Sequence, residues 1–282
     1  MLDIIRQMEF RQFVFDEDSE AVVDMHRCAE ILEGSWFDAS DTCKINAKIV
    51  ARTPGSSWVI AYGNMIFAHA DLLKVNETEA MVSGWRTHED YNHPMINKIL
   101  FDGLCDMARK REYSGLMIFG DNSKVDDAMQ PLGLKSDRQY QWVNLDDIAK
   151  GIVLGSRKIF IHPDEVAANE LKTFLGSPLP PSFIINRANI AAEYRLFHHR
   201  KPETFEIVDG LKTYIACQDG REWHIFKKGD FKADPEIVPS LLKTVSDLSN
   251  GPPRILLSTK ALETVDILPS NDGVYNDYYN PL

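Results

Sequence analysis

The order of apolar patterns between residues 57 and 120 restricts the fold more than any other feature of the sequence. Three short apolar runs separated by turn residues predict three meandering strands: Ser57–Tyr62, Met65–Val75 and Ala80–Thr87. From Ile96 to Met107 the apolar residues recur every three or four positions, which is the period of a helix, and Gly115–Gly120 is a further apolar run. A meander followed by a helix and a further strand predicts a mixed sheet with helices packed on it, an α+β fold.

The flanking segments extend this pattern over residues 10–145. Phe10–Phe15 predicts a strand, and Asp16–Leu32 predicts a helix with one apolar face. Asn122–Met129 predicts a short helix and Gln139–Leu145 a last strand. Gly84 inside the strand Ala80–Thr87 indicates a bulge or a close approach of backbone.

The second half repeats part of this order more loosely. Its predicted strands are Ile159–Ile161, Thr204–Val208, Thr213–Cys217, Glu222–Lys227 and Arg254–Ser258. Its predicted helices are Asp164–Leu175, Ile185–His199 and Pro235–Leu248, with a short helix or loop at Leu262–Leu268. The tail Asn271–Leu282 has no periodicity. We therefore expect two domains, residues 1–148 and 149–282, with the boundary near Asp147–Gly151.

Composition excludes several classes of protein. Of 282 residues, 44% are hydrophobic and 26% charged, which is typical of a globular chain. A net charge of −11 disfavours a general binder of nucleic acid or anionic membranes, because such a protein needs a basic face. The four cysteines lie far apart with no CxxC pair, so we expect free thiols and no metal site. The N-terminus has no signal-peptide core, and the longest uncharged stretch contains turn residues, so we expect a cytoplasmic protein without a membrane span.

The element order and loop residues of segment 80–134 resemble the central part of the GCN5-related N-acetyltransferase (GNAT) family. His88-Glu89-Asp90-Tyr91 is similar to the family's Val/His-Pro-Asp-Tyr run after the splayed strand. Asn122 stands where the family has its Asn, and Gly133-Leu134 replaces Gly-Phe. The second half looks like a degenerate copy of the first half. The resemblance therefore implies two GNAT-like domains in tandem, each a twisted mixed sheet flanked by helices.

Two family signatures differ in this sequence. The family loop Arg-Gly-x-Gly-x-Gly/Ala holds the pyrophosphate of acetyl-CoA with backbone N–H groups at a helix start. The corresponding positions 92–97 read Asn-His-Pro-Met-Ile-Asn here, and Pro94 has no N–H. Met129 stands at the position of the family's general-acid Tyr, and its side chain cannot donate a proton.

The resemblance implies a set of residues around acetyl-CoA as the acyl donor, with no metal. The residues implied to meet its acetyl, pantetheine and pyrophosphate groups are Trp85, Arg86, Thr87, Asn92, His93, Met95, Ile96, Asn97, Lys98 and Asn122. For proton transfer, His88, Glu89 and Asp90 follow the strand closely enough to offer a base, and Tyr140 is the nearest phenol. His69 on the neighbouring strand is a further candidate. Each also has a structural interpretation as a surface, capping or core residue.

The resemblance favours an acyl-CoA-dependent N-acyltransferase, in which a small-molecule or peptide amine attacks the thioester directly in a ternary complex. The altered loop and the missing Tyr leave open a second hypothesis, a catalytically inactive GNAT-fold binding or regulatory module. A third hypothesis is a tandem relative that transfers aminoacyl or peptidyl groups to a carrier or tRNA, against which the acidic charge balance argues.

Overall fold

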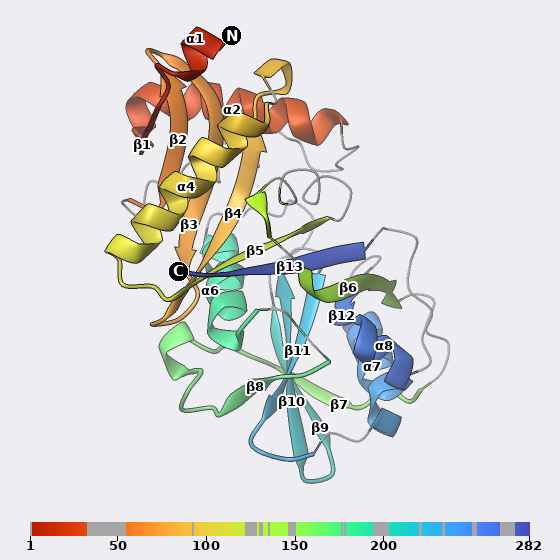
Figure 1. The fold of residues 1–282 in the computed structure, drawn as a ribbon. Coiled ribbons are helices and arrows are strands. Elements are labelled where there is room, and N and C mark those ends of the chain that lie inside the picture. The colour runs from red at the N-terminus through yellow and green to blue at the C-terminus, as the bar shows by residue number, and fades with distance from the viewer. Residues whose placement is uncertain are drawn as a thin grey trace. The chain divides into compact units, whose positions relative to one another are not determined.

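A computed structural model describes the elements that form two compact units (Figure 1). The described residues are 2–32, 55–91, 93–121, 129, 132–134, 136–145, 151–175, 177, 179–193, 203–219, 222–232, 235–249, 253–265 and 274–282. Unit 1 comprises Met1–Asp137 and Asp277–Leu282, and unit 2 comprises Arg138–Asn276. The mixed sheets with flanking helices confirm the predicted α+β class. The expected boundary at residue 148 stays a prediction. The chain passes from unit 1 to unit 2 after Asp137 and returns to unit 1 at Asp277.

Unit 1 is built on a sheet that begins as an antiparallel meander and ends with a parallel pair. Its strands, in spatial order, are β1 (Glu9–Gln12), β2 (Ser57–Tyr62), β3 (Met65–Lys74), β4 (Glu79–Thr87), β5 (Gly115–Asp121) and β13 (Val274–Pro281). The first four pair antiparallel, and β4 pairs parallel with β5. The hairpin, the third strand and the strand after the helix were therefore predicted correctly.

Helices cover both faces of this sheet. α4 (Pro94–Lys110) turns its buried side chains, among them Leu100 and Leu104, toward the core cluster that contains Trp58 and Ile60. α2 (Phe15–Leu32) covers the other face, where Val22 and Met25 pack with Val59 and Ala61. Because alternate residues of β2 enter different cores, nearly the whole strand is apolar. α1 (Leu2–Ile5) and the 3₁₀ turn η1 (Glu89–Tyr91) complete the described helical elements of this unit apart from single residues.

Unit 2 repeats the same sheet order. Its strands, in spatial order, are β6 (Ser136–Asn144), β12 (Arg254–Ser258), β11 (Glu222–Lys228), β10 (Lys212–Asp219), β9 (Thr204–Asp209) and β7 (Gly155–Ile159). β9, β10 and β11 form the antiparallel meander, and β11 pairs parallel with β12. An additional strand, β8 (Leu171–Thr173), pairs antiparallel with β11. Its helices are α6 (Pro181–Glu193), which contacts β10, α7 (Val238–Leu248), whose buried residues enter the core, and α8 (Thr259–Val265).

In the second half, one predicted helix was wrong, the strand predicted at Ile159–Ile161 lies earlier in the chain as β7, and the tail had no predicted conformation. The predicted helix Asp164–Leu175 is instead the 3₁₀ turn η4 (Pro163–Glu165), a series of turns and the strand β8. Glu170 has φ 50°, which ends the helical path, and the next residues gain hydrogen bonds on the edge of β11 that a helix would not give. The tail without periodicity contains β13, whose Tyr278 is buried in the core of unit 1. The predicted helix Asn122–Met129 lies outside the described residues except for Met129 itself.

Candidate functional site

The parallel pair at the centre of unit 1 separates along its length. Pairing between β4 and β5 runs from Glu79–Gly115 to Val82–Ile118, while β4 continues to Thr87. Gly84 has φ +60°, and the register with β3 shifts beside it, so β4 has a bulge at this point, which is one of the two alternatives that the sequence indicated. Among the described residues, the β5 side of the last part of β4 therefore has no strand beside it. We call this edge, residues 83–87, the β4 edge.

A buried amide fixes the end of β4 to the first turn of α4. The Asn97 side-chain oxygen accepts hydrogen bonds from the Trp85 indole N–H at 3.2 Å and from the Thr87 hydroxyl at 2.6 Å. The Asn97 side chain is almost fully buried, and the Trp85 ring lies beside Phe101 on α4. Because one oxygen accepts two donors, both lone pairs of the Asn97 carbonyl are occupied.

The first turn of α4 satisfies its own backbone N–H groups. The His93 ring nitrogen Nδ1 accepts from the Met95 N–H at 3.1 Å, and Pro94 has no N–H. The N–H groups of Ile96 and Asn97 donate to the His93 carbonyl at 2.9 and 3.4 Å. A helix start binds phosphate with N–H groups that lack an internal partner. These residues therefore do not fit a diphosphate group.

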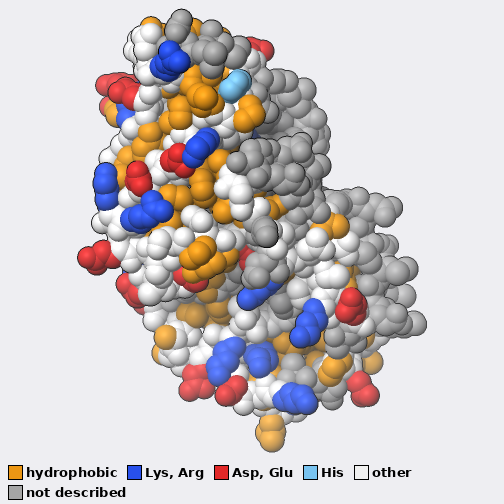
Figure 2. All heavy atoms as spheres, in the orientation of Figure 1, with side chains coloured by type: hydrophobic (Ala, Val, Ile, Leu, Met, Phe, Trp, Pro, Cys, Tyr) orange, Lys and Arg blue, Asp and Glu red, His pale blue; other side chains and the backbone are white. Residues whose placement is uncertain are grey.

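Charges around this turn are balanced or acidic. The Lys98 ammonium lies 2.7 Å from the Asp102 carboxylate one turn further on, and Asp90 exposes its carboxylate in the loop before the helix. A second pair, Arg109 with Asp106, lies near the end of α4. Figure 2 shows basic and acidic side chains next to one another over this helix. Lys98 was predicted to face a pyrophosphate, and here its charge is shared with a neighbouring carboxylate.

The two histidines of the loop both use Nδ1 as an acceptor. His88 Nδ1 accepts from the Asp90 N–H at 3.3 Å, as His93 does from Met95. In a neutral ring the other nitrogen, Nε2, then carries the proton and acts as a donor. The His88 ring also packs against Tyr91, which in turn packs edge-on against Phe67. In this arrangement His88 presents a hydrogen-bond donor, and a catalytic role for it stays a prediction.

The structure brings together only some of the predicted site residues. Trp85, Thr87 and Asn97 form one hydrogen-bonded group, whereas Ile96 is buried in the core and Met95 is exposed. Arg86 donates weakly to the carbonyl of Trp85 at 3.4 Å.

Among the remaining predicted residues, one belongs to the other unit and three have side chains that are not described. Tyr140 belongs to unit 2, where it is 1% exposed and pairs across β6 and β12 with Ser258. Glu89 lies in η1, and its side chain is outside the described residues, as are Asn92 and Asn122. Their roles stay predictions.

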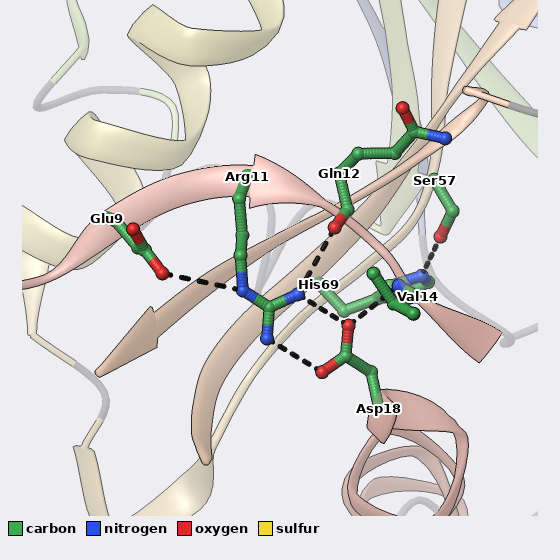
Figure 3. Close-up of polar contacts among 7 residues, drawn as sticks. All are labelled: Glu9, Arg11, Gln12, Val14, Asp18, Ser57 and His69. Carbon is green, nitrogen blue, oxygen red and sulfur yellow. Dashed lines mark hydrogen bonds and ion pairs between the residues drawn. The ribbon is translucent and has the colours of Figure 1, made fainter. Parts of the chain in front are cut away.

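A polar network under α2 was only partly visible in the sequence (Figure 3). The Arg11 guanidinium forms two hydrogen bonds of 2.6 and 2.8 Å with the Asp18 carboxylate, which also accepts from the Val14 N–H at 2.8 Å. Beside it, the Ser57 hydroxyl lies 2.6 Å from His69 Nε2. His69 was considered as a possible base. The ion pair was not foreseen, because Arg11 and Asp18 belong to different elements and each alone resembles a surface charge.

No family model matches the sequence, and no curated protein matches it. Many solved structures do match the fold. A protein from Pyrococcus horikoshii, described provisionally as an acetyltransferase, is 13% identical with a TM-score of 0.64 over 98% of this chain and 90% of its own. A GCN5-related N-acetyltransferase from Anabaena variabilis is 11% identical with a TM-score of 0.60 over 97% of this chain and 72% of its own. A tandem GNAT protein from the clavulanic acid biosynthesis pathway is 15% identical with a TM-score of 0.60 over 97% of this chain and 98% of its own.

These similarities extend over both units. The chain therefore has the tandem fold of GCN5-related N-acetyltransferases, and the resemblance predicted from residues 80–134 is confirmed at the level of the fold. Within the part of the chain that the structure describes, no helix is both long and apolar enough to cross a membrane.

Proposed function

We propose that this chain is an acyltransferase that moves an acyl group from a thioester to an amine, with unit 1 as the donor-binding unit. The observation that carries the proposal is the separation of β4 from β5 beyond Val82, on a fold shared with acetyltransferases. Among the described residues, the separation leaves no strand on this side of the β4 edge, where an extended substrate can lie. The acceptor we propose is a small-molecule or peptide amine.

The reaction requires few groups from the protein. The amine nitrogen attacks the thioester carbonyl, a C–N bond forms, the C–S bond breaks, and the amine proton passes to the departing thiolate. Backbone N–H groups stabilise the negative oxygen of the tetrahedral intermediate when they are held in place in advance. The hydrogen bonds from Trp85 and Thr87 to Asn97 hold the end of β4 in this way. His88, beside Asp90, is our candidate for this transfer, because its donor nitrogen can give a proton to the departing thiolate and then take up the amine proton.

A specific observation favours the alternative, a binding module without catalysis. The helix start that holds a diphosphate in the family has no N–H left over among Pro94–Asn97. Met129, at the position of the family's Tyr, is 1% exposed and belongs to the core. Both features remove groups that acetyl transfer from acetyl-CoA uses in the family.

Transfer activity separates the two functions. The full chain is incubated with acetyl-CoA or S-acetylpantetheine and a panel of polyamines, amino acids and peptides, and mass spectrometry follows the acetylated amine and the free thiol. We expect acetylated product with at least one amine, and at least a tenfold lower rate for Asn97→Ala. Asn64→Ala, a change in the exposed β2–β3 turn, serves as the matched control and retains the rate. If no donor and no amine gives product, the chain is the binding module.

A further inference from the structure

We propose that unit 1 recognises the pantetheine arm of its acyl thioester and not a diphosphate, so that the nucleotide half of coenzyme A adds nothing to binding. The inference rests on the proposed function and names its donor class. The shared chemistry is a neutral extended chain with two amides and a terminal thioester. Free coenzyme A thioesters and phosphopantetheine arms attached to a carrier protein both contain it.

The first argument is the occupied helix start. A diphosphate would have to displace the His93 ring from the Met95 N–H, and it would find no donor at Pro94. The next two N–H groups already donate to the His93 carbonyl. The exposed Asp90 carboxylate precedes this turn, and the Lys98 charge is paired with Asp102, so the local charge also disfavours a dianion.

The second argument is the side chain at position 97. Asn97 fills the space between the first turn of α4 and the end of β4, and its oxygen is fully used by Trp85 and Thr87. These two contacts join the helix start to the β4 edge. The Asn97 amide nitrogen remains as a donor, which suits a neutral carbonyl.

The third argument comes from unit 2, where a strand lies along the edge that corresponds to the β4 edge. β11 pairs parallel with β12 only at Glu222 and Trp223, after which the two strands separate as β4 and β5 do. Beyond the separation, β8 lies along β11 with Phe226 opposite Thr173 and Lys228 opposite Leu171. An extended chain of amides therefore fills this edge in unit 2. In the described part of unit 1, the corresponding β4 edge has no such strand.

The β4 edge also has a suitably directed donor. The backbone N–H of His88 donates to the Phe67 carbonyl on β3, at 2.8 Å. Because N–H groups alternate in direction along a strand, the Thr87 N–H points away from β3, toward the open side. This backbone group can bind an amide carbonyl of the arm without any change in the sheet.

The test compares three donors on the unmodified full chain: S-acetylpantetheine, S-acetyl-4′-phosphopantetheine and acetyl-CoA. Titration calorimetry at low and high salt measures the dissociation constant of each. We expect the three constants to agree within threefold and to change little with salt. A constant at least tenfold lower for acetyl-CoA than for S-acetylpantetheine would overturn the inference and leave the proposed function standing. Absence of binding by all three would overturn both.

Two variants at position 87 test the edge itself. Thr87→Pro removes the N–H that faces the open side, while Thr87→Val removes only the hydroxyl bound to Asn97. We expect Thr87→Pro to raise the dissociation constants of all three donors by at least tenfold more than Thr87→Val does. Equal effects of the two variants would show that the N–H is not used. The comparison of donors on the unmodified chain does not depend on whether Thr87→Pro folds.

A variant at the helix start tests the other half of the inference. His93→Ala frees the Met95 N–H, so the affinity for acetyl-CoA should rise about threefold relative to that for S-acetylpantetheine. His162→Ala is the matched control, because His162 caps η4 in unit 2 in the same way before Pro163. The control should leave the ratio unchanged. An unchanged ratio in His93→Ala would contradict the assignment of His93 as the group that closes the turn.

Discussion

At the scale of single residues, the functions of polar side chains depended on partners that the sequence does not place beside them. Asn97 was predicted to face a pyrophosphate, and instead it accepts hydrogen bonds from two residues of β4. His69 could be read as a base or as a core residue, and its neighbour Ser57 lies twelve positions away on another strand. Residue type limited what each group can donate or accept, and tertiary contact selected the partner.

His224 provides a residue-scale prediction about pH. It is buried on β11 opposite Cys217, near Asp219, Glu222 and Arg187, and burial lowers its pKa from 6.5 to about 4. Between pH 4 and 6.5 the His224 side chain is therefore protonated in the unfolded chain and neutral in the folded chain. We expect the free energy of unfolding to fall by about 2–3 kcal/mol as the pH drops from 6.5 to 4.

Denaturant unfolding at several pH values checks this. His224→Phe should remove the His224 contribution, so the difference between wild type and variant should change with pH in that window. His162→Phe, at an exposed histidine of the same unit, is the control and should change nothing. A pH profile of His224→Phe parallel to that of the wild type would contradict the prediction. Comparison with the variant is needed because burial also raises the pKa of Glu222, which acts in the opposite direction.

At the scale of elements, local pattern predicted strands and helices well where each element follows its own periodicity. The helix after β4 and the meanders of both units are of this kind, because each has an apolar face that only one period explains. β8 and β13 have no such pattern. Each is a strand because an edge was available to it, on β11 and beside β5 respectively. Their conformations were therefore not predictable from their own residues.

The link between β1 and α2 gives an element-scale prediction. Burial raises the pKa of Asp18, but hydrogen bonds from Arg11 and the Val14 N–H outweigh it and hold the pKa below 3.8. Asp18→Asn keeps the shape and removes the charge that holds Arg11. We expect a loss of about 2–3 kcal/mol in the free energy of unfolding at pH 7, less than the loss of about 3–5 kcal/mol for a fully buried pair, because the Arg11 side chain is 24% exposed.

The pH dependence of Asp18→Asn follows from the sign of the shift. The carboxylate stabilises the fold fully above pH 3.8, the unfolded value, and this contribution is lost as the pH falls through the lower folded pKa. The difference between wild type and variant should therefore disappear in acid. Asp16→Asn, in the same first turn but exposed, should cost less than about 0.5 kcal/mol. Equal losses for the two variants would show that the buried pair contributes nothing.

At the scale of the whole molecule, the two compact units are not two consecutive halves of the sequence. Most of β6 belongs to unit 2, although it precedes the expected boundary at residue 148. The end of β13 belongs to unit 1, although it is the last strand of the chain. Tyr278 enters the core of unit 1, and the Leu282 N–H donates to the Ser114 carbonyl at 3.0 Å. Each unit therefore contains residues from both sides of the expected boundary.

This arrangement predicts that the expected domains do not fold alone. A fragment of residues 1–148 lacks the strand beside β5, and a fragment of residues 149–282 lacks β6 beside β12. We expect each fragment to lack cooperative thermal unfolding, and the two expressed together to form a stable complex. Circular dichroism and size-exclusion chromatography measure both. Cooperative unfolding of residues 1–148 alone would contradict the role of β13.

The labelling of Cys105 provides a local readout for the same experiment. Burial raises the pKa of the Cys105 thiol to about 11, and Asn280 on β13 donates to its sulfur at 3.4 Å. In the fragment of residues 1–148, a thiol reagent should modify Cys105 much faster than in the full chain. Cys217 in unit 2, buried with a pKa of about 12, is the reference within the full chain.

The sequence by itself determined the class of fold, most of the regular elements and the place where the β4 edge and the following helix start meet. It did so because apolar periodicity and turn residues act over a few neighbouring positions. Tertiary structure alone decided that β8 fills an edge in unit 2, that β13 joins unit 1, and that Asn97 accepts hydrogen bonds from Trp85 and Thr87 at the end of β4. These outcomes depend on hydrogen-bonding groups brought together by the whole fold, and local pattern carries no information about such distant partners.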